Sequence, residues 1–175
     1  ELLALAERLA QQPEPHALAG KILGLLFFNP SLRTLASFQA AMARLGGRAV
    51  YLRHDEVGLG TREPPRDVAR VLSRMVDGIA ARTFEQATLT ELAQWASVPV
   101  VNALSDEEHP CQALADLLTL RERLGGLEGV RLTYLGEGNN IAISLAYASV
   151  LAGMHFVCAS PEEYVAIFTP NATGA

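Results

Sequence analysis

The segment Asn29-Pro30-Ser31-Leu32-Arg33-Thr34 places two hydroxyl groups and an arginine at the predicted start of a helix. It follows the apolar run 22–28, which is typical of a strand buried on both faces. The first turn of a helix carries unpaired N–H groups and partial positive charge, so Arg33 is unfavourable there unless an anion compensates it. A phosphate would satisfy Arg33 together with Ser31 and Thr34. The alternative is that Ser31 is an ordinary N-cap and Arg33 a solvated charge.

A second strand-to-helix junction contains His109-Pro110-Cys111-Gln112. Proline at the first helical position leaves His109 just outside the helix, with Gln112 on the same side. A histidine there could donate a hydrogen bond to a carbonyl oxygen that gains negative charge, and the glutamine amide could bind a neighbouring polar group. Helix capping by Gln112 with a solvated His109 is the alternative. Cys111 is interpreted as a packing residue rather than as a nucleophile.

Arg82 ends a third predicted strand at the same sheet edge. In an open parallel sheet, ligands bind at the carboxyl ends of the strands. An arginine that covers apolar surface is the alternative for Arg82 taken alone. Three successive junctions with a cationic or polarising group favour a shared anion site that includes Arg33, Arg82 and His109.

The turn Gly136-Glu137-Gly138-Asn139-Asn140 also joins a strand to a helix. It matches a dinucleotide fingerprint weakly, because Ile141 stands where the third glycine is expected. The amides of Asn139 and Asn140 suit the carboxylate or amino group of an amino acid. Helix N-capping by asparagine is the alternative.

Composition narrows the class of protein. The 175 residues include 14 Lys+Arg and 19 Asp+Glu, for a net charge of −5, with the basic residues scattered, which argues against a nucleic-acid binder. No apolar run approaches a membrane span and no signal pattern is visible, so we expect no membrane contact and a cytoplasmic location. The two cysteines exclude a disulfide framework. Asp106, His109 and Cys111 do not have the spacing of a common metal site, so we expect no metal there.

Short apolar runs alternate with longer amphipathic stretches, which predicts an α/β fold with an open parallel sheet and helices on both faces. Expected helices cover 1–12, 31–45, 64–76, 87–96, 110–124 and 139–152. Expected strands cover 22–28, 48–53, 78–83, 98–102, 130–135 and 156–159, with a loop at 54–63 and no element at 165–175.

Three glycines within 125–129 mark the expected domain boundary. The first domain would cover 1–125. Residues 129–175 would be the incomplete start of a second, Rossmann-like α/β domain, because two strands and one helix cannot complete such a domain. We therefore expect the chain to be part of a protein of about 300 residues.

Together these motifs resemble those of the aspartate/ornithine carbamoyltransferase family, and more closely its ornithine branch. Residues 31–34 are similar to the family's Ser-x-Arg-Thr carbamoyl phosphate motif, and 109–112 to its His-Pro-x-Gln motif. The segments 102–105 and 114–118 are similar too, and 136–140 resembles the Gly-Asp-Gly-Asn-Asn turn that opens the amino-acid domain of the ornithine enzymes. The resemblance spans residues 1 to about 160.

The resemblance implies carbamoyl transfer from carbamoyl phosphate to ornithine, giving citrulline and phosphate. It implies catalytic roles for Arg33, Arg82 and His109. The implied carbamoyl phosphate ligands are Ser31, the Leu32 backbone, Arg33, Thr34, Arg82, His109 and Gln112. Asn140, with Asn139, would bind the amino-acid acceptor. Family members are trimers or multiples of trimers that need no cofactor, so the resemblance implies a homotrimer or a multiple of trimers acting in arginine metabolism.

The chain departs from the family pattern at several positions. Leu32 and Leu35 replace a threonine and an arginine, Gly58 stands where many ornithine enzymes have a glutamine, and Glu137 replaces an aspartate. The family's later Ser-Met-Gly and His-Cys-Leu-Pro motifs are not in these residues. A different acceptor, such as an N-acylated ornithine or aspartate, therefore stays open. The motifs are also compatible with a non-catalytic phosphate- or dinucleotide-binding module, or with a degenerate homologue kept for assembly.

Overall fold

The computed structural model describes residues 1–164. The chain divides into two compact units, Glu1–Asp106 and Glu107–Ala175, and each is described by itself. None of the helices within 1–164 is long and apolar enough to cross a membrane.

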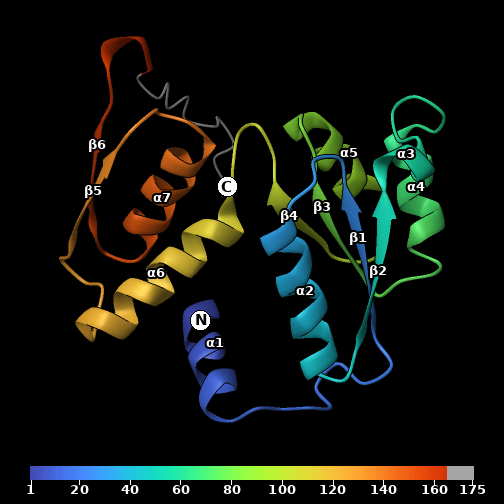
Figure 1. The fold of residues 1–175 in the computed structure, drawn as a ribbon, viewed down its shortest axis with the longest axis horizontal. Helices are drawn as coiled ribbons and strands as arrows, with labels where there is room; N and C mark the ends of the chain where they lie inside the picture. Colours follow the sequence, from blue (N-terminus) through green and yellow to red (C-terminus); the bar gives the residue numbers. More distant parts are fainter. Residues whose placement is uncertain (165–175) are drawn as a thin grey trace. The chain divides into compact units, whose positions relative to one another are not determined.

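The first unit is a parallel α/β layer (Figure 1). Its elements in chain order are α1 (Leu2–Gln11), β1 (Ile22–Phe27), α2 (Leu32–Arg44), β2 (Arg48–Arg53), α3 (His54–Val57), α4 (Pro65–Leu72), β3 (Gly78–Arg82), α5 (Gln86–Trp95) and β4 (Val100–Leu104). The four strands are all parallel, in the order β2-β1-β3-β4. Because they are parallel, the ends of β1 and β3 and the connections that follow them share one edge of the sheet.

The sheet register places Arg82 beside the end of the central strand. Phe27, the last residue of β1, pairs with Arg82 on β3 and with Arg53 on β2. At the opposite end of β1, Asp77 accepts hydrogen bonds from Lys21 Nζ at 2.8 Å and from the Ile22 N–H at 2.9 Å. These contacts hold the register at both ends of β1.

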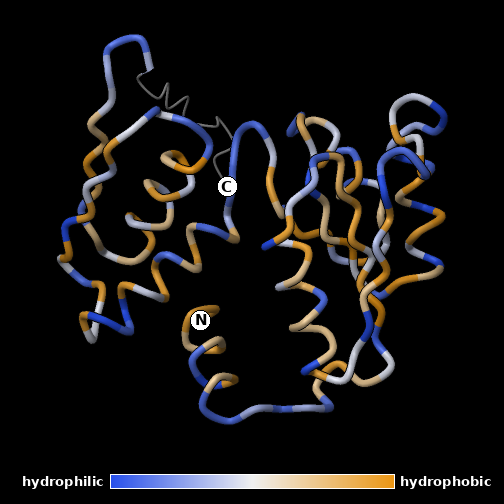
Figure 2. The backbone as a smooth tube through the Cα atoms, in the orientation of Figure 1, coloured by the Kyte–Doolittle hydropathy of each residue, from blue (hydrophilic) through white to orange (hydrophobic). Residues whose placement is uncertain are grey.

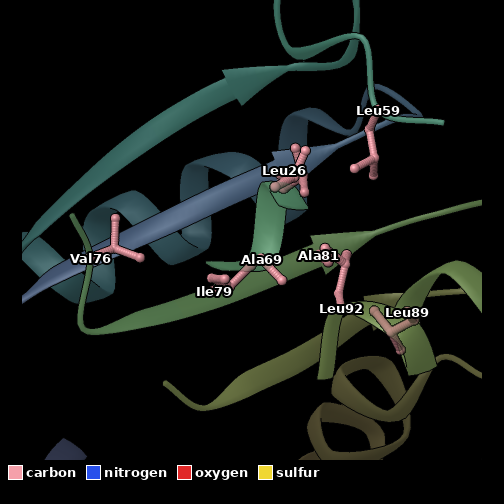
Figure 3. Packing of buried hydrophobic residues seen from close by; sticks show 9 residues of the cluster. Leu26, Leu59, Ala69, Val76, Ile79, Ala81, Leu89 and Leu92 are labelled. Carbon is pink, nitrogen blue, oxygen red and sulfur yellow. The ribbon is translucent and has the colours of Figure 1, made fainter. Parts of the chain in front are cut away.

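Helices cover both faces of this sheet, as the sequence predicts. Leu25 and Phe27 pack with Ala80, Leu35 and Phe38 on the face that α2 covers. Because side chains alternate along a strand, the residues between them point to the other face. That second face carries the larger core, which lies against α4 and α5 (Figure 3) and consists of Leu26, Leu59, Val68, Ala69, Val76, Ile79, Ala81, Leu89 and Leu92.

Hydropathy along the backbone follows this arrangement. The central strands β1 and β3 are hydrophobic, whereas the loop around residues 60–63 and the residues after β4 are hydrophilic (Figure 2). The polar connections lie at the strand ends, where the candidate site residues are.

The second unit contains α6 (Pro110–Leu124), β5 (Arg131–Leu135), α7 (Asn140–Leu151), β6 (His155–Ala159) and the 3₁₀ turn η1 (Glu162–Tyr164). β5 and β6 are parallel neighbours. α6 packs against α7. Gly125 ends α6 with φ +80°, a left-handed conformation that glycine adopts without steric cost.

The predicted elements are all present among the described residues, with shifted ends. Residues 54–57, expected as loop, form the short helix α3; α4 ends at Leu72, and β4 begins at Val100. The compact units divide at Asp106/Glu107, and α6 contacts α7 within the second unit. The domain boundary at 125–129 stays a prediction. The expectation for 165–175 lies outside the described residues.

Candidate functional site

The start of α2 shows how Ser31 and Thr34 interact. Ser31 is the N-cap: its Oγ accepts a hydrogen bond from the Thr34 N–H at 3.5 Å and donates one to Thr34 Oγ1 at 2.9 Å. The Ser31 carbonyl accepts the N–H of Leu35 at 3.0 Å, which is the first helical bond of this turn. Ser31 therefore caps the helix, as the capping interpretation expected, while both hydroxyls stay at its N-terminus.

Arg33 lies in this first turn without an acidic neighbour. No acidic residue is present in the first turn of α2, and Arg33 is exposed. Leu32 beside it is 83% exposed. The positive end of the helix and the guanidinium thus have like polarity, which favours an anion at this position.

Arg82 lies on the face of the sheet that α2 covers. Ile79 and Ala81 belong to the core under α4 and α5, and Ala80 to the core under α2, so strand alternation places Arg82 on the α2 side. The Arg82 carbonyl accepts the N–H of Phe28 at 2.9 Å. The strand register therefore brings Arg82 to the edge of the sheet where β1 ends. The connection from β1 to α2 starts at that edge (Figure 1).

The guanidinium of Arg82 is partly buried. Within residues 1–164, its Nε is buried and has no hydrogen-bond partner. Burial lowers the pKa of Arg82, because removing the cation from water disfavours the charged form. A buried donor on a cation is costly to leave unmatched, and an anion at this edge would match it.

His109 is the N-cap residue of α6, with Pro110 in the first turn, as predicted. Its side chain makes no capping hydrogen bond, and its N–H donates to Ser144 Oγ on α7 at 2.8 Å. The capping interpretation expected the Gln112 amide to fold back on the backbone. Instead, Gln112 Nε2 donates a hydrogen bond to Asp116 Oδ1 at 2.9 Å.

Asn139 is the N-cap of α7. Its Oδ1 accepts the N–H groups of Ile141 at 3.0 Å and Ala142 at 3.4 Å. The capping interpretation is thus confirmed for this oxygen. Binding of an amino-acid acceptor by the amide groups of Asn139 and Asn140 stays a prediction.

Cys111 lies in the first turn of α6 and is partly buried. Burial raises the pKa of the Cys111 thiol, so the neutral thiol is favoured at physiological pH. This agrees with the interpretation of Cys111 as a packing residue, because the thiolate is the nucleophile.

The structure thus assembles the predicted residues in two groups. Ser31, Leu32, Arg33, Thr34 and Arg82 belong to the first unit. His109 and Gln112 on α6 belong to the second unit, together with Asn139 and Asn140 on α7. One cavity shared by Arg33, Arg82 and His109 remains a prediction.

Sequence reasoning missed His54 at the same edge of the first unit. The His54 ring lies 4.6 Å from the Phe28 ring, centroid to centroid, with 32° between the planes. Its Nδ1 is buried without a hydrogen-bond partner within residues 1–164. The signal was a histidine directly after the predicted strand 48–53, at the sheet edge where Arg82 ends another predicted strand.

The fold and these side chains define an α/β protein with cationic and polar groups at the carboxyl ends of parallel strands. Residues 1–122 match the family model described as "Aspartate/ornithine carbamoyltransferase, carbamoyl-P binding domain". The chain belongs to the aspartate/ornithine carbamoyltransferase family.

Curated relatives are similar over most of this chain. It is 54% identical over 164 residues to an ornithine carbamoyltransferase from Thermus thermophilus. The matched region covers 93% of this chain and 54% of the relative. It is 49% identical to that from Gloeobacter violaceus, with 97% of the chain and 53% of the relative covered. The chain spans about half the length of these relatives.

Solved structures show the same fold. The crystal structure of ornithine carbamoyltransferase from Thermus thermophilus has a TM-score of 0.91 and 52% identity, with 95% of this chain and 58% of that chain covered. Ornithine carbamoyltransferase from Pyrococcus furiosus has a TM-score of 0.89 at 44% identity and covers 94% of this chain and 53% of that chain. These likenesses confirm the predicted fold class.

Proposed function

We propose that the whole protein transfers the carbamoyl group of carbamoyl phosphate to the side-chain amine of ornithine. The unprotonated amine attacks the carbamoyl carbon, and the bond from that carbon to the bridging oxygen breaks. The proton that the amine loses passes to the departing phosphate. The products are citrulline and inorganic phosphate. Relatives named ornithine carbamoyltransferase, similar over more than nine-tenths of this chain, support this acceptor over aspartate or an N-acylated ornithine.

One structural observation carries the proposal. Arg82 presents a partly buried guanidinium, with no partner for Nε within residues 1–164, on the sheet face covered by α2. The first turn of α2 contributes a second cation, Arg33, and the positive end of the helix. A phosphate group would neutralise both cations and accept from the unpaired N–H groups.

The residues then have distinct proposed roles. Arg33 and Arg82 bind the phosphoryl oxygens, assisted by the hydroxyls of Ser31 and Thr34 and by the backbone N–H of Leu32. Arg82 also acts with His109 in the next step. As the carbamoyl carbon becomes tetrahedral, the carbonyl oxygen gains negative charge, and these donors stabilise it.

The remaining groups would orient the two substrates. Gln112 would bind the carbamoyl amide through its side chain, once its hydrogen bond to Asp116 is exchanged. Asn140, with the amide nitrogen of Asn139, would bind the amino-acid acceptor. No metal or other cofactor takes part in the proposed reaction, and the proposed substrates are small molecules rather than a nucleic acid or a membrane.

We also propose that the whole protein is a homotrimer, or a multiple of trimers, that works in the cytoplasm in arginine metabolism. Leu32 is an apolar side chain that is 83% exposed at the start of α2. A neighbouring subunit that covered this residue would bury apolar surface next to the phosphate ligands. Sedimentation velocity checks the oligomeric state: a monomer at micromolar concentration would contradict the trimer.

Isothermal titration of the full chain with carbamoyl phosphate tests the phosphate site. We expect saturable binding, and we expect Arg33→Ala to weaken it by roughly tenfold to a hundredfold, as a lost charge-assisted contact does. Arg44→Ala is the matched control, because Arg44 is an exposed arginine in the last turn of the same helix. Binding of NAD without binding of carbamoyl phosphate would overturn the proposal.

A further inference from the structure

A β-bulge lies beside Arg82 in the pairing of β3 with β4. Ala81 pairs with Asn102, but Arg82 pairs with Leu104, so Ala103 is the extra residue on β4. Bulges bend a strand, increase its twist and re-aim neighbouring side chains, and they are frequent next to functional sites. The irregularity therefore falls at the residue whose guanidinium faces the proposed anion.

Backbone hydrogen bonds continue beyond this bulge and hold the two strand ends together. The N–H of Thr83 donates to the Leu104 carbonyl at 2.9 Å, and the N–H of Asp106 donates to the Phe84 carbonyl at 2.8 Å. Thr83 is buried, and its hydroxyl donates to the Glu85 carbonyl at 3.1 Å. The chain on the carboxyl side of Arg82 is thus fixed against the end of β4.

Side chains complete the connection. Ser105 is fully buried, and its Oγ donates a hydrogen bond to Gln86 Oε1 at 2.6 Å. Ser105 Oγ also accepts from Asn102 Nδ2 at 3.4 Å. Asp106 Oδ1 accepts the N–H of Gln86 at 2.8 Å, which places a carboxylate at the start of α5. Buried polar networks of this kind hold the backbone in one arrangement.

Arg82 depends on this backbone for its direction. Its Nε has no hydrogen-bond partner within residues 1–164, and no ion pair to a carboxylate of these residues holds its guanidinium. The path of the backbone on either side therefore has a large part in setting where the side chain points. Small misplacements of a group that binds a reactant weaken its action strongly.

We propose that Ser105 and Gln86 are positioning residues that aim Arg82 at the phosphate through the bulge at Ala103. This proposal rests on the proposed function, because it names what sets the geometry of that site. Neither residue touches the substrate. The hydrogen bond between them clamps the end of β4 to the start of α5. Residues 83–85, which follow Arg82, connect β3 to α5.

A double-mutant cycle tests the proposal by the affinity of the full chain for carbamoyl phosphate. We expect Ser105→Ala to weaken binding roughly three- to thirtyfold in the parent chain and less than about twofold in an Arg82→Ala background, as coupled residues do. Equal losses in both backgrounds, or no loss in the parent chain, would overturn it.

Ser73→Ala is the matched control. The Ser73 hydroxyl donates to the Ala69 carbonyl at 2.7 Å and accepts the N–H of Ser97 at 3.0 Å, so it also joins two segments. The two segments that it joins follow the ends of α4 and α5, away from the sheet edge that carries Arg82. We expect Ser73→Ala to lower the melting temperature and leave the affinity for carbamoyl phosphate unchanged. A loss of affinity equal to that of Ser105→Ala would mean that general destabilisation, not positioning, is measured.

A second measurement does not depend on the ligand. The ¹⁵N resonance of Arg82 Nε, assigned by its loss in Arg82→Lys, should shift in ligand-free Ser105→Ala and stay in place in Ser73→Ala. Should Ser105→Ala fail to fold, Gln86→Met breaks the same hydrogen bond by removing its acceptor, Gln86 Oε1. Gln86 is partly exposed, and methionine is of similar size. A parent chain that does not bind carbamoyl phosphate contradicts the proposed function. An unshifted Arg82 resonance contradicts the positioning role.

Discussion

The backbone carbonyl of Arg82 accepts a hydrogen bond from the N–H of Phe28 at 2.9 Å. Phe28 is the first residue after β1, and Arg82 is the last residue of β3. This bond extends the pairing of the two central strands to the point where the chain turns toward α2. It ties the strand end that carries Arg82 to the connection that carries Ser31, Arg33 and Thr34. This is why we expect a single anion to contact both junctions.

Arg82→Met should weaken the binding of carbamoyl phosphate without lowering the stability of the ligand-free protein. Methionine keeps the apolar stem and removes a charge whose Nε is buried without a partner within residues 1–164. We expect the affinity for carbamoyl phosphate to fall roughly tenfold to a hundredfold. The urea midpoint without ligand should stay equal or rise, because no buried cation is left to solvate. A large drop in the midpoint would show that Arg82 has a structural role instead.

Ser31→Asp should separate helix capping from anion binding. Aspartate is as good an N-cap as serine, so the free energy of unfolding should change little, whereas Ser31→Ala should lower it by about 1 kcal/mol or less. The aspartate would repel a phosphate at the same helix end, so we expect a greater loss of affinity for Ser31→Asp than for Ser31→Ala. Titration calorimetry and urea unfolding of both variants check this. Tighter phosphate binding by Ser31→Asp would contradict the site.

His109→Ala should lower turnover of the full-length enzyme more than it weakens binding of carbamoyl phosphate. The proposed hydrogen bond from His109 strengthens as the carbonyl oxygen gains charge, so its loss is felt mainly in the transition state. Steady-state kinetics and calorimetry on the same variant check this. Gln112→Ala offers a comparison, because its amide would bind the ground state as well. Equal losses in kcat and affinity for His109→Ala would count against the oxyanion role.

Asp77 should make the stability of the first unit depend on acid pH. The hydrogen bond from Lys21, then that from the Ile22 N–H, lowers the pKa of Asp77. A carboxyl with a lowered folded-state pKa contributes stability above its ordinary pKa, near 3.8, and loses it as pH falls through the folded value. We therefore expect the unfolding free energy of the parent chain to fall more steeply below about pH 4 than that of Asp77→Asn. Parallel pH profiles would refute this contribution.

Cys111 should be dispensable for the chemistry. Its thiol has a raised pKa because it is buried, so little thiolate is present at neutral pH. We expect Cys111→Ser to keep the turnover of the full-length enzyme within about threefold, as conservative replacements of packing residues do. A loss of several orders of magnitude would restore the nucleophile hypothesis.

The fold was largely predictable because its signals are local. The uninterrupted apolar run at 22–28 identifies a central strand, and the core on both of its faces confirms this. Pro110 and Gly125 mark the two ends of α6 correctly. The helix at 54–57 was missed because a four-residue helix that ends at Gly58 carries no periodic pattern.

The site was predictable only in part. Residue types at strand ends pointed to Arg33, Arg82 and His109, because helix termini and parallel strands have known polarity. The bulge at Ala103 and the bond between Ser105 and Gln86 depend on the register between distant strands, which no local pattern contains. The sequence allowed the Asn139 oxygen either to cap α7 or to bind a ligand, and only the folded structure separates the two roles.

The most direct test of the central claim is an NMR titration of the full chain with carbamoyl phosphate, observing two groups at once. They are the Nε resonance of Arg82 and the backbone amide resonances of residues 32–34. We predict that both shift and follow one dissociation constant, because one phosphate contacts both junctions. Resonances that do not move, or that follow two different constants, would contradict a shared site.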